Sequence, residues 1–334
     1  MDQKRLFLAI AISVAILLGF QLLVKPYLPQ PPAAPQHVVT GPSQPGAQPG
    51  AQPARTAATP LEGSPGQGAP PAAGQPGAVP KEVPRLKISA PKLQGSFSLL
   101  GARLDDLVLT EYRETLAPNS PLVRLLEPRS EAKPYYVQYG WSAAPGAQVK
   151  LPDNDTVWTA PSETLGVGHP VTLSWDNGGG LTFELVLSLD DNYMFGVEQR
   201  VKNDTGAPVK LYPWARIRRD YTPEVSGYYI MFEGLLGVAN GTLQETNYAH
   251  AKSEGEKRNG IAFDATSTGG WAGITDKYWL TALIPDQSVP VKAAFRHLTE
   301  NGSDRYQVDF VTEAAQTAAP NAEATSTTRL FAGA

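Results

Sequence analysis

The 334-residue sequence contains no cysteine. Disulfide bonds, thiolate nucleophiles, cysteine-based metal sites and a lipid attached to cysteine are therefore excluded. The sequence also lacks a basic excess, because 28 Lys and Arg oppose 32 Asp and Glu for a formal net charge of −4. Without a basic stripe that neutralises phosphates, we expect no nucleic-acid partner.

Recognisable motifs of catalytic or cofactor sites are also missing. The sequence has no P-loop, dinucleotide fingerprint or Gly-x-Ser-x-Gly motif. Its four histidines, His37, His169, His250 and His297, do not follow metal-ligand spacing. We therefore expect no cofactor, no metal and no enzymatic activity.

An apolar run near the N-terminus is the clearest physical signal. Residues 6–24 contain no charge, and only a serine and a glutamine among them are polar. At ~1.5 Å per residue the run is roughly 28 Å long, close to the ~30 Å hydrocarbon core of a bilayer. We predict that residues 1–25 form a cytoplasmic N-terminus and a signal-anchor helix spanning the membrane at 6–24. Lys4 and Arg5, ahead of the run, favour this orientation.

A cleaved signal peptide is the alternative to an anchor. Such a peptide has a shorter apolar region, of about 7–15 residues, with small residues at a cleavage site just after it. Here Lys25 and Pro26 follow the run, and the small residues Ala33 and Ala34 come later. The uncleaved anchor fits this pattern better.

Residues 26–84 have a distinct composition. About half of the 31 prolines lie there, in repeated Gln-Pro-Gly-Ala units at 44–47, 48–51 and 75–78. A segment with so few large apolar groups cannot offset the entropy of ordering. We predict a disordered linker, whose r.m.s. span as a flexible coil is about 40 Å. A Pro-rich ligand for another protein is the functional alternative.

Residues 85–334 consist of short, alternating apolar runs separated by turn residues. Asp176–Gly179 and Asn203–Gly206, for example, are typical hairpin connections. Almost no stretch has a helical period, so we predict one mainly β domain, a large antiparallel sandwich. The predicted strands are 96–100, 102–110, 135–139, 171–175, 181–189, 193–203, 209–218, 227–232, 242–248, 260–263, 269–275, 278–284, 292–298 and 304–312.

Charged residues cluster at two places in the predicted domain. Arg216, Arg218 and Arg219, followed by Asp220, are the densest cationic group. We interpret them as a solvated strand edge with a local ion pair, and an anion-binding site is the alternative. The charge-alternating run 252–258 is interpreted as a surface loop.

The most distinctive local string lies at residues 269–285 and begins Gly-Gly-Trp-Ala-Gly-Ile-Thr-Asp-Lys-Tyr-Trp. It predicts two strands joined by a Thr-Asp-Lys turn, with two tryptophans that contribute a large buried area. Core packing is the simpler interpretation, and an aromatic groove is the alternative. The candidates for partner or groove contacts are Trp271, Tyr278, Trp279, Arg216 and Arg218.

Four features, in this order, resemble the N-terminal part of the YidC/Oxa/Alb family of membrane protein insertases in its Gram-negative form. They are the apolar helix directly after residues 1–5, the low-complexity segment 26–84, the strand region 181–203, and the string Gly-Gly-Trp-x-Gly-x-Thr-Asp-x-Tyr-Trp with its following Leu-Ile-Pro. The last of these is the most specific. The resemblance covers essentially the whole chain.

The resemblance implies a non-enzymatic membrane insertase and chaperone component of the inner membrane, with a periplasmic β-supersandwich related to galactose mutarotases. Its partners would be the lipid bilayer, the Sec translocon on its SecDF and SecYEG side, and nascent inner-membrane proteins. The family's hydrophilic membrane groove, with an essential arginine, uses five further transmembrane helices that this sequence does not include. Residues 329–334 resemble the end of the periplasmic domain. Arg216 and Arg218 are therefore not assigned to the groove.

Two other functions stay open at this point. One is a carbohydrate-binding or mutarotase-like enzyme, which would need a convergent acid and base; the candidates His169, His250 and His297 lie in no recognisable motif. The other is a stand-alone tethered scaffold of the periplasm.

Overall fold

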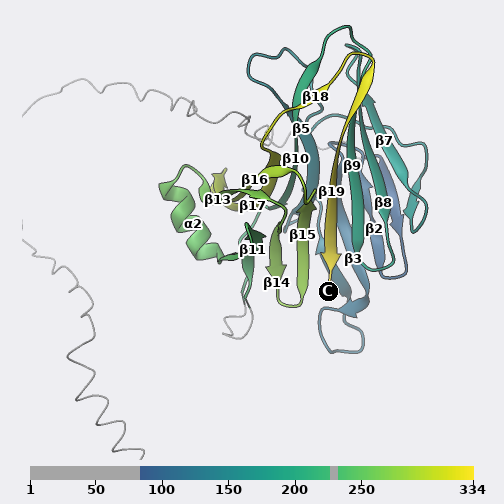
Figure 1. The fold of residues 1–334 in the computed structure, drawn as a ribbon. Coiled ribbons are helices and arrows are strands. Elements are labelled where there is room, and N and C mark those ends of the chain that lie inside the picture. Colours follow the sequence, from purple (N-terminus) through teal and green to yellow (C-terminus); the bar gives the residue numbers. More distant parts are fainter. Residues whose placement is uncertain (1–82, 226–231) are drawn as a thin grey trace, which may run out of the picture. The chain divides into compact units, whose positions relative to one another are not determined.

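The computed structural model describes residues 83–225 and 232–334 (Figure 1). The anchor predicted at 1–25 and nearly all of the linker predicted at 26–84 lie outside these residues, so both stay predictions. Within the described part of the chain, no helix is long and apolar enough to span a bilayer.

Two large sheets form the domain, and their strands are antiparallel except for the β1–β6 pair. The first sheet has 11 strands and the path β13-β16-β17-β10-β5-β3-β2-β1-β6, with β18 paired to β10 and β4 to β3. Its strands are β1 Arg85–Ser89, β2 Leu93–Ser98, β3 Arg103–Arg113, β4 Leu122–Leu126, β5 Tyr135–Ala143, β6 Thr164–Gly166, β10 Val209–Arg219, β13 Ile261–Thr268, β16 Pro290–Glu300, β17 Ser303–Thr312 and β18 Gln316–Ala318.

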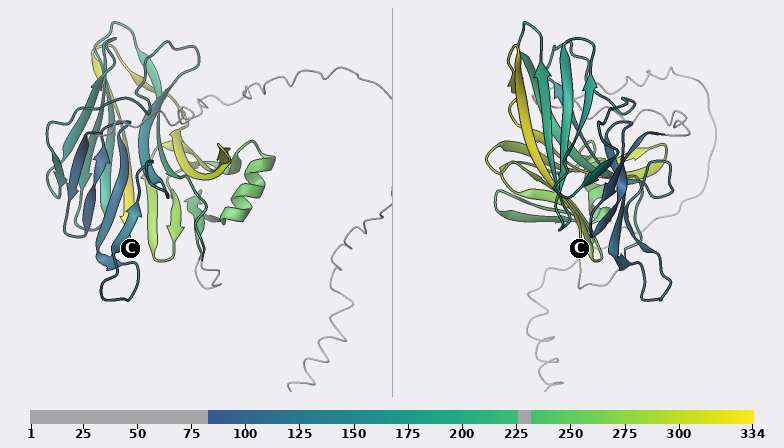
Figure 2. Two further views of the ribbon diagram at one scale, coloured as in Figure 1. Left: turned by 180° about the vertical axis from the view of Figure 1, so that it is seen from behind. Right: turned by 90° about the vertical axis from the view of Figure 1, so that its right-hand side faces the viewer.

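The second sheet has 8 strands in the order β12-β11-β14-β15-β19-β9-β8-β7. Its strands are β7 Val171–Asp176, β8 Leu181–Leu189, β9 Met194–Asn203, β11 Gly234–Ala239, β12 Thr242–Thr246, β14 Trp271–Asp276, β15 Trp279–Pro285 and β19 Ala322–Gly333. The two sheets are seen as two layers when the domain is turned on its side (Figure 2). The predicted mainly β antiparallel sandwich is confirmed.

The core lies between the sheets because each strand turns one face inward. In β8 and β9, alternate side chains are buried, as the period of two in their sequences requires. Aromatic rings join the layers: Trp141 of β5 meets Phe183 of β8 edge to face, with ring centroids 5.1 Å apart. One continuous apolar cluster includes residues of both sheets, so the domain has a single core.

Most predicted strands overlap observed ones, whereas β1, β4, β6, β11, β18 and β19 were not predicted. The strand predicted at 227–232 falls almost wholly outside the described residues. The hairpin connection predicted at 176–179 is confirmed, because β7 pairs with β8. The one predicted at 203–206 is wrong, because this turn leads from β9 in the smaller sheet to β10 in the larger sheet.

The predicted surface loop 252–258 is wrong, because this segment belongs to the helix α2, Tyr248–Lys257. Asn247 caps the helix by accepting a hydrogen bond from the backbone N–H of His250 at 2.8 Å. Its buried residues are Tyr248, Ala251 and Gly255, and it packs on β13 and β16. A Cβ added at Gly255 would lie 2.9 Å from the Cβ of His297, so the glycine permits this close approach.

A polar contact between α2 and strands β16 and β17 also fixes the helix to the sheet. Lys252 donates to Asp304 at 2.9 Å, and the other Asp304 oxygen lies 2.9 Å from Nε2 of His297. The hydrogen bond from Lys252, together with that from His297, lowers the pKa of Asp304 below its ordinary 3.8. A carboxyl with a lowered pKa stabilises the fold above its ordinary pKa, and this contribution is lost as the pH falls through the lowered value.

Acid should therefore weaken this contact. We expect the wild-type domain to exceed the Asp304→Asn variant in free energy of unfolding at pH 6, and the difference to shrink below about pH 4 as the wild-type carboxyl takes up a proton. Urea unfolding of both proteins at pH 6 and pH 3 measures the difference. A difference that stays constant between these pH values would contradict the stabilising role assigned to the ionised carboxylate of Asp304.

Candidate functional site

The arginine cluster lies inside the sandwich, and the predicted solvated strand edge is wrong. Its strand, β10, runs between β5 and β17, in the interior of the larger sheet. Arg216, Arg218 and Arg219 are 1%, 2% and 2% exposed. A buried guanidinium requires hydrogen-bond or charge partners, so each arginine is best described by the groups around it.

Among the residues that the structure describes, Arg216 has no carboxylate partner in its hydrogen bonds. Its Nη2 donates to the side chain of Gln138 at 2.6 Å, and the guanidinium carbon lies 5.1 Å from the ring centroid of Trp214. Burial lowers the pKa of Arg216 to about 10. Arg216 therefore serves as an internal hydrogen-bond donor rather than a contact for a partner.

Arg218 belongs to a closed ring of charges. It donates to Asp220 at 2.7 Å and to Glu300 at 2.8 Å, and Arg305 contacts the same two carboxylates at 2.5 and 3.2 Å. The predicted local ion pair of the cluster with Asp220 is confirmed. Burial alone would lower the pKa of Arg218, but nearby groups, Asp220 and Glu300 among them, outweigh it and raise the pKa.

Arg219 links the two sheets, and we call its contacts the arginine junction. Its Nη1 and Nη2 donate to the two carboxylate oxygens of Asp276 at 2.6 and 2.5 Å, and Nη1 also donates to the hydroxyl of Tyr248 at 2.6 Å. The ring of Tyr135 lies 4.1 Å from the guanidinium carbon. The junction therefore joins β10 of one sheet, β14 of the other and the first residue of α2.

Burial lowers the pKa of Arg219, but the attraction of Asp276 outweighs it and holds the pKa well above the ordinary value. The same burial raises the pKa of Tyr135. Arg219 is therefore a permanent cation, neutralised by one bidentate carboxylate.

The string at 269–285 forms the hairpin β14–β15, as predicted, although its turn is shifted by one residue. The two strands pair until Asp276 faces Trp279, so the turn consists of Lys277 and Tyr278. Tyr278 adopts φ 86°, a left-handed conformation that bulky residues rarely take. The tyrosine at the turn is thus held in a costly backbone geometry, with its ring directed outward.

The aromatic residues of this string do not form a groove. Trp279 packs against the core. Its ring centroid lies 5.1 Å from that of Tyr112 in β3 and 6.2 Å from that of Tyr278. Trp271 is half-buried on the other face of β14, away from the buried side chains of Ala272 and Ile274. Only Tyr278, which is 61% exposed, is freely available to a partner.

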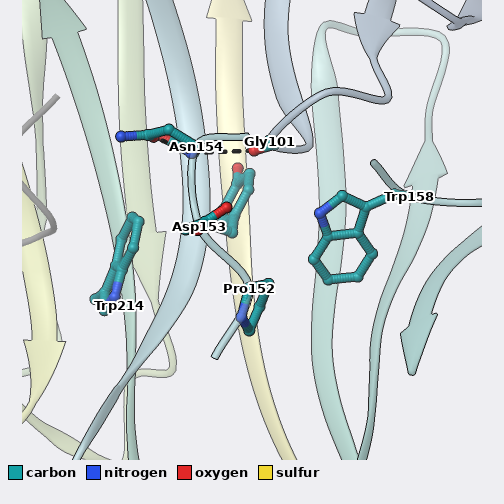
Figure 3. Close-up of a pocket in the computed structure, with 8 residues that line it drawn as sticks. Gly101, Pro152, Asp153, Asn154, Trp158 and Trp214 are labelled. Atoms are coloured by element: carbon teal, nitrogen blue, oxygen red, sulfur yellow. Dashed lines mark hydrogen bonds between the residues drawn. The ribbon is translucent and has the colours of Figure 1, made fainter. Parts of the chain in front are cut away.

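Two cavities of the described residues meet at Trp214, and each has room for about one water molecule. One, of about 10 Å³, is lined by Gly101, Pro152, Asp153, Asn154, Trp158 and Trp214 together with Gln138 and Tyr139 (Figure 3). The other, of about 20 Å³, lies beside Gln199 and Thr312. The hydroxyl of Tyr139 and the indole N–H of Trp214 are buried and have no hydrogen-bond partner in the described part of the chain. Ordered water is the ligand that suits such a site.

The structure therefore brings together two of the features singled out in the sequence. The arginine cluster and the tryptophan-rich string meet through Arg219 and Asp276, neither of which is among the five candidate contact residues. A sequence signal was present, because Asp276 is one of few charged residues in an apolar hairpin. Its partner, 57 residues earlier in the chain, could not be inferred from spacing.

Several solved structures of carbohydrate-active proteins are similar in fold at very low identity. A putative aldose 1-epimerase from Escherichia coli K12 is 10% identical, with a TM-score of 0.48 over 75% of this chain and 99% of that chain. A galactose mutarotase related enzyme from Lactobacillus acidophilus is 5% identical, with a TM-score of 0.47 over 75% of this chain and 97% of that chain. These values say nothing about activity.

Sequence comparison is much more specific. Several curated relatives are named "Membrane protein insertase YidC". The relative from Granulibacter bethesdensis is 53% identical over 100% of this chain and 55% of its own length. The relative from Acidiphilium cryptum is 53% identical over 75% of this chain and 43% of its own length. The relative from Methylorubrum extorquens is 40% identical over 100% of this chain and 55% of its own length. The chain thus spans about half the length of the curated relatives it matches. The family model "YidC periplasmic domain" matches residues 85–334, and the chain belongs to this family.

Proposed function

We propose that this chain supplies the anchor and the periplasmic domain of a membrane protein insertase of the bacterial inner membrane. The observation that carries the proposal is the 53% identity over the whole chain to a relative named as such an insertase. The N-terminus would be cytoplasmic, and residues 85–334 would lie in the periplasm. The product would act on nascent inner-membrane proteins, in contact with the lipid bilayer and with the SecDF and SecYEG side of the Sec translocon.

In this proposal the domain is not an enzyme. Mutarotase-type chemistry needs an acid and a base that converge on one sugar-sized pocket. His169 is exposed in the turn before β7, His250 is exposed on α2, and His297 is buried against Asp304 beneath that helix. Three histidines in three places do not favour a shared acid and base. No group of His, Asp and Glu in the described ranges is suited to hold a metal ion.

The Sec partnership can be tested by co-purification. We expect Sec components to co-purify with the affinity-tagged native protein from membranes dissolved in a mild detergent, whereas an unrelated inner-membrane protein with the same tag should not retain them. Monosaccharides should neither raise the melting temperature of the protein nor change their anomeric ratio faster in its presence. Accelerated mutarotation, together with absence of Sec components, would favour the carbohydrate enzyme instead.

A further inference from the structure

Exposed apolar side chains from both sheets gather at one end of the domain. Leu116, in the loop after β3, is fully exposed, while Tyr278 is 61% and Tyr112 37% exposed. The loop after β3, the β14–β15 turn and the end of β19 lie at the same end, at the bottom of Figure 1. We call Tyr112, Leu116, Tyr278 and Trp279 the apolar tip. Trp279 joins the two parts of it, because its ring contacts both tyrosines.

The backbone at Tyr278 is a second observation at the same place. Glycine or asparagine would adopt φ 86° at lower cost than tyrosine. Strained residues persist where their surroundings fix them, and they are concentrated at functional positions. Here the arginine junction holds Asp276, the residue directly before the turn, and so fixes the base of the hairpin.

We propose that the apolar tip docks into the interfacial layer of a lipid bilayer. Tyrosine and tryptophan favour that layer because their rings are apolar and their O–H or N–H groups stay hydrated. The tip is made of side chains from the end of β3 and the loop after it, and from the β14–β15 turn and the start of β15, rather than of a groove. Stable protein interfaces need complementary surfaces of about 800 Å² on each partner, whereas lipid adapts to isolated projecting side chains.

The chain itself places a bilayer within reach, and in this respect the inference depends on the anchor in the proposed function. A flexible linker of the length predicted for residues 26–84 has an r.m.s. span of about 40 Å. Such tethering raises the effective concentration of the membrane surface, so a weak contact suffices for docking.

The charged groups around the tip do not make it basic. Arg113 is exposed, but so are Glu111, Glu114 and Asp191. Lys277 lies against the ring of Tyr278, with Nζ 5.7 Å from the centroid. Attraction to anionic lipid is therefore not the driving force, and docking should depend little on salt or on the fraction of anionic lipid.

The absence of native cysteine permits a direct test with single-cysteine variants. Ala117→Cys adjoins Leu116 at the tip, and Ala147→Cys lies in an exposed turn after β5, at the opposite end of the sandwich. The full 334-residue chain, one copy per phosphatidylcholine nanodisc, carries an environment-sensitive fluorophore at one of these cysteines. Brominated lipid should quench the label at 117 strongly and the label at 147 weakly. Equal quenching at both positions would overturn the proposal.

A second pair of variants separates docking from folding. Tyr278→Asn relieves the backbone strain, so it should leave the melting temperature unchanged or higher while it reduces quenching at position 117. Leu116→Ser should lower the ratio of docked to free domain about tenfold, because a leucine side chain loses its burial in lipid. Unchanged quenching in both variants would contradict docking through this tip.

Failure of this test can be distinguished from failure of the proposed function. If the labelled chain does not stay with the nanodisc at all, the anchor is wrong and the proposed function loses its basis. If the chain stays with the nanodisc but position 117 is not quenched, only the docking is wrong. Quenching that disappears in 0.5 M salt would show attraction by charge and would contradict the apolar mechanism.

Discussion

Replacement of Asp276 by alanine should destabilise the folded domain by about 3–5 kcal/mol, because it leaves a buried cation without its counter-charge. The guanidinium of Arg219 is 2% exposed, and both Nη atoms donate to this carboxylate. After the substitution, the hydroxyl of Tyr248 would remain as the hydrogen-bond partner of Nη1 within residues 83–225 and 232–334. For a domain of this size, the melting temperature should fall on the order of 10 °C.

Replacement of the arginine, rather than of the aspartate, should destabilise the folded domain less. Asp276 is 24% exposed, so water can hydrate its carboxylate when Arg219→Met removes the guanidinium. The double variant Arg219→Met/Asp276→Ala should be more stable than Asp276→Ala alone, because an apolar pair replaces an uncompensated charge. Urea unfolding of the wild type and the three variants measures this cycle.

A matched control is available on the surface of the same domain. Arg258 and Asp264 form an ion pair of 2.6 Å, but their side chains are 48% and 53% exposed. Asp264→Ala should cost less than about 1 kcal/mol, because exposed ion pairs contribute little. Two outcomes would show that burial is not what makes the arginine junction strong. One is an equal loss of unfolding free energy in Asp264→Ala and Asp276→Ala. The other is a double variant no more stable than Asp276→Ala.

Local periodicity and turn chemistry were sufficient to predict most of the sheet strands. The strands β8 and β9 alternate clearly between apolar and polar residues, and their connecting turns are rich in Asp, Asn and Gly. By contrast, β19 carries Ala, Ser and Thr at most of its positions, so its sequence has a weak apolar alternation. Its place between β9 and β15 comes from pairing over its whole length, a tertiary effect that a sequence window does not contain.

The helix and the arginines were misjudged for related reasons. The buried face of α2 consists of a tyrosine, an alanine and a glycine, which gives little amphipathic signal, and a glycine weakens a helix intrinsically. For the arginines, composition indicates charge but not position in the sheet. Whether β10 is an edge or a central strand depends on β5 and β17, strands that are distant in sequence. Burial of the cluster could therefore not be predicted.

The candidate site was identified in part. The string at 269–285 was singled out correctly as a hairpin, and Tyr278 is the member of it that solvent reaches. Arg216 and Arg218 are enclosed, so their role as partner contacts is now unfavourable on physical grounds. Trp279 is half-buried and supports the exposed rings of Tyr112 and Tyr278. Two of the exposed tip residues, Tyr112 and Leu116, belong to no recognisable motif. Only the fold brings them to the end of the domain that carries Tyr278.

Depletion of the native product should reduce the insertion of inner-membrane proteins many-fold, because the proposed function makes this product part of the insertion machinery. Pulse-labelled inner-membrane proteins that have inserted become accessible to protease added to the periplasmic side, so protected and cleaved fractions can be compared over time. The gene for the whole product should restore insertion. A matched exported periplasmic protein, which needs no insertion, should mature at the normal rate.

The proposed function is therefore best tested by the fraction of a newly made inner-membrane protein that inserts in cells depleted of this product. We expect a large loss of insertion, restored by the whole gene. Normal insertion in cells that retain none of the product would contradict the proposed function.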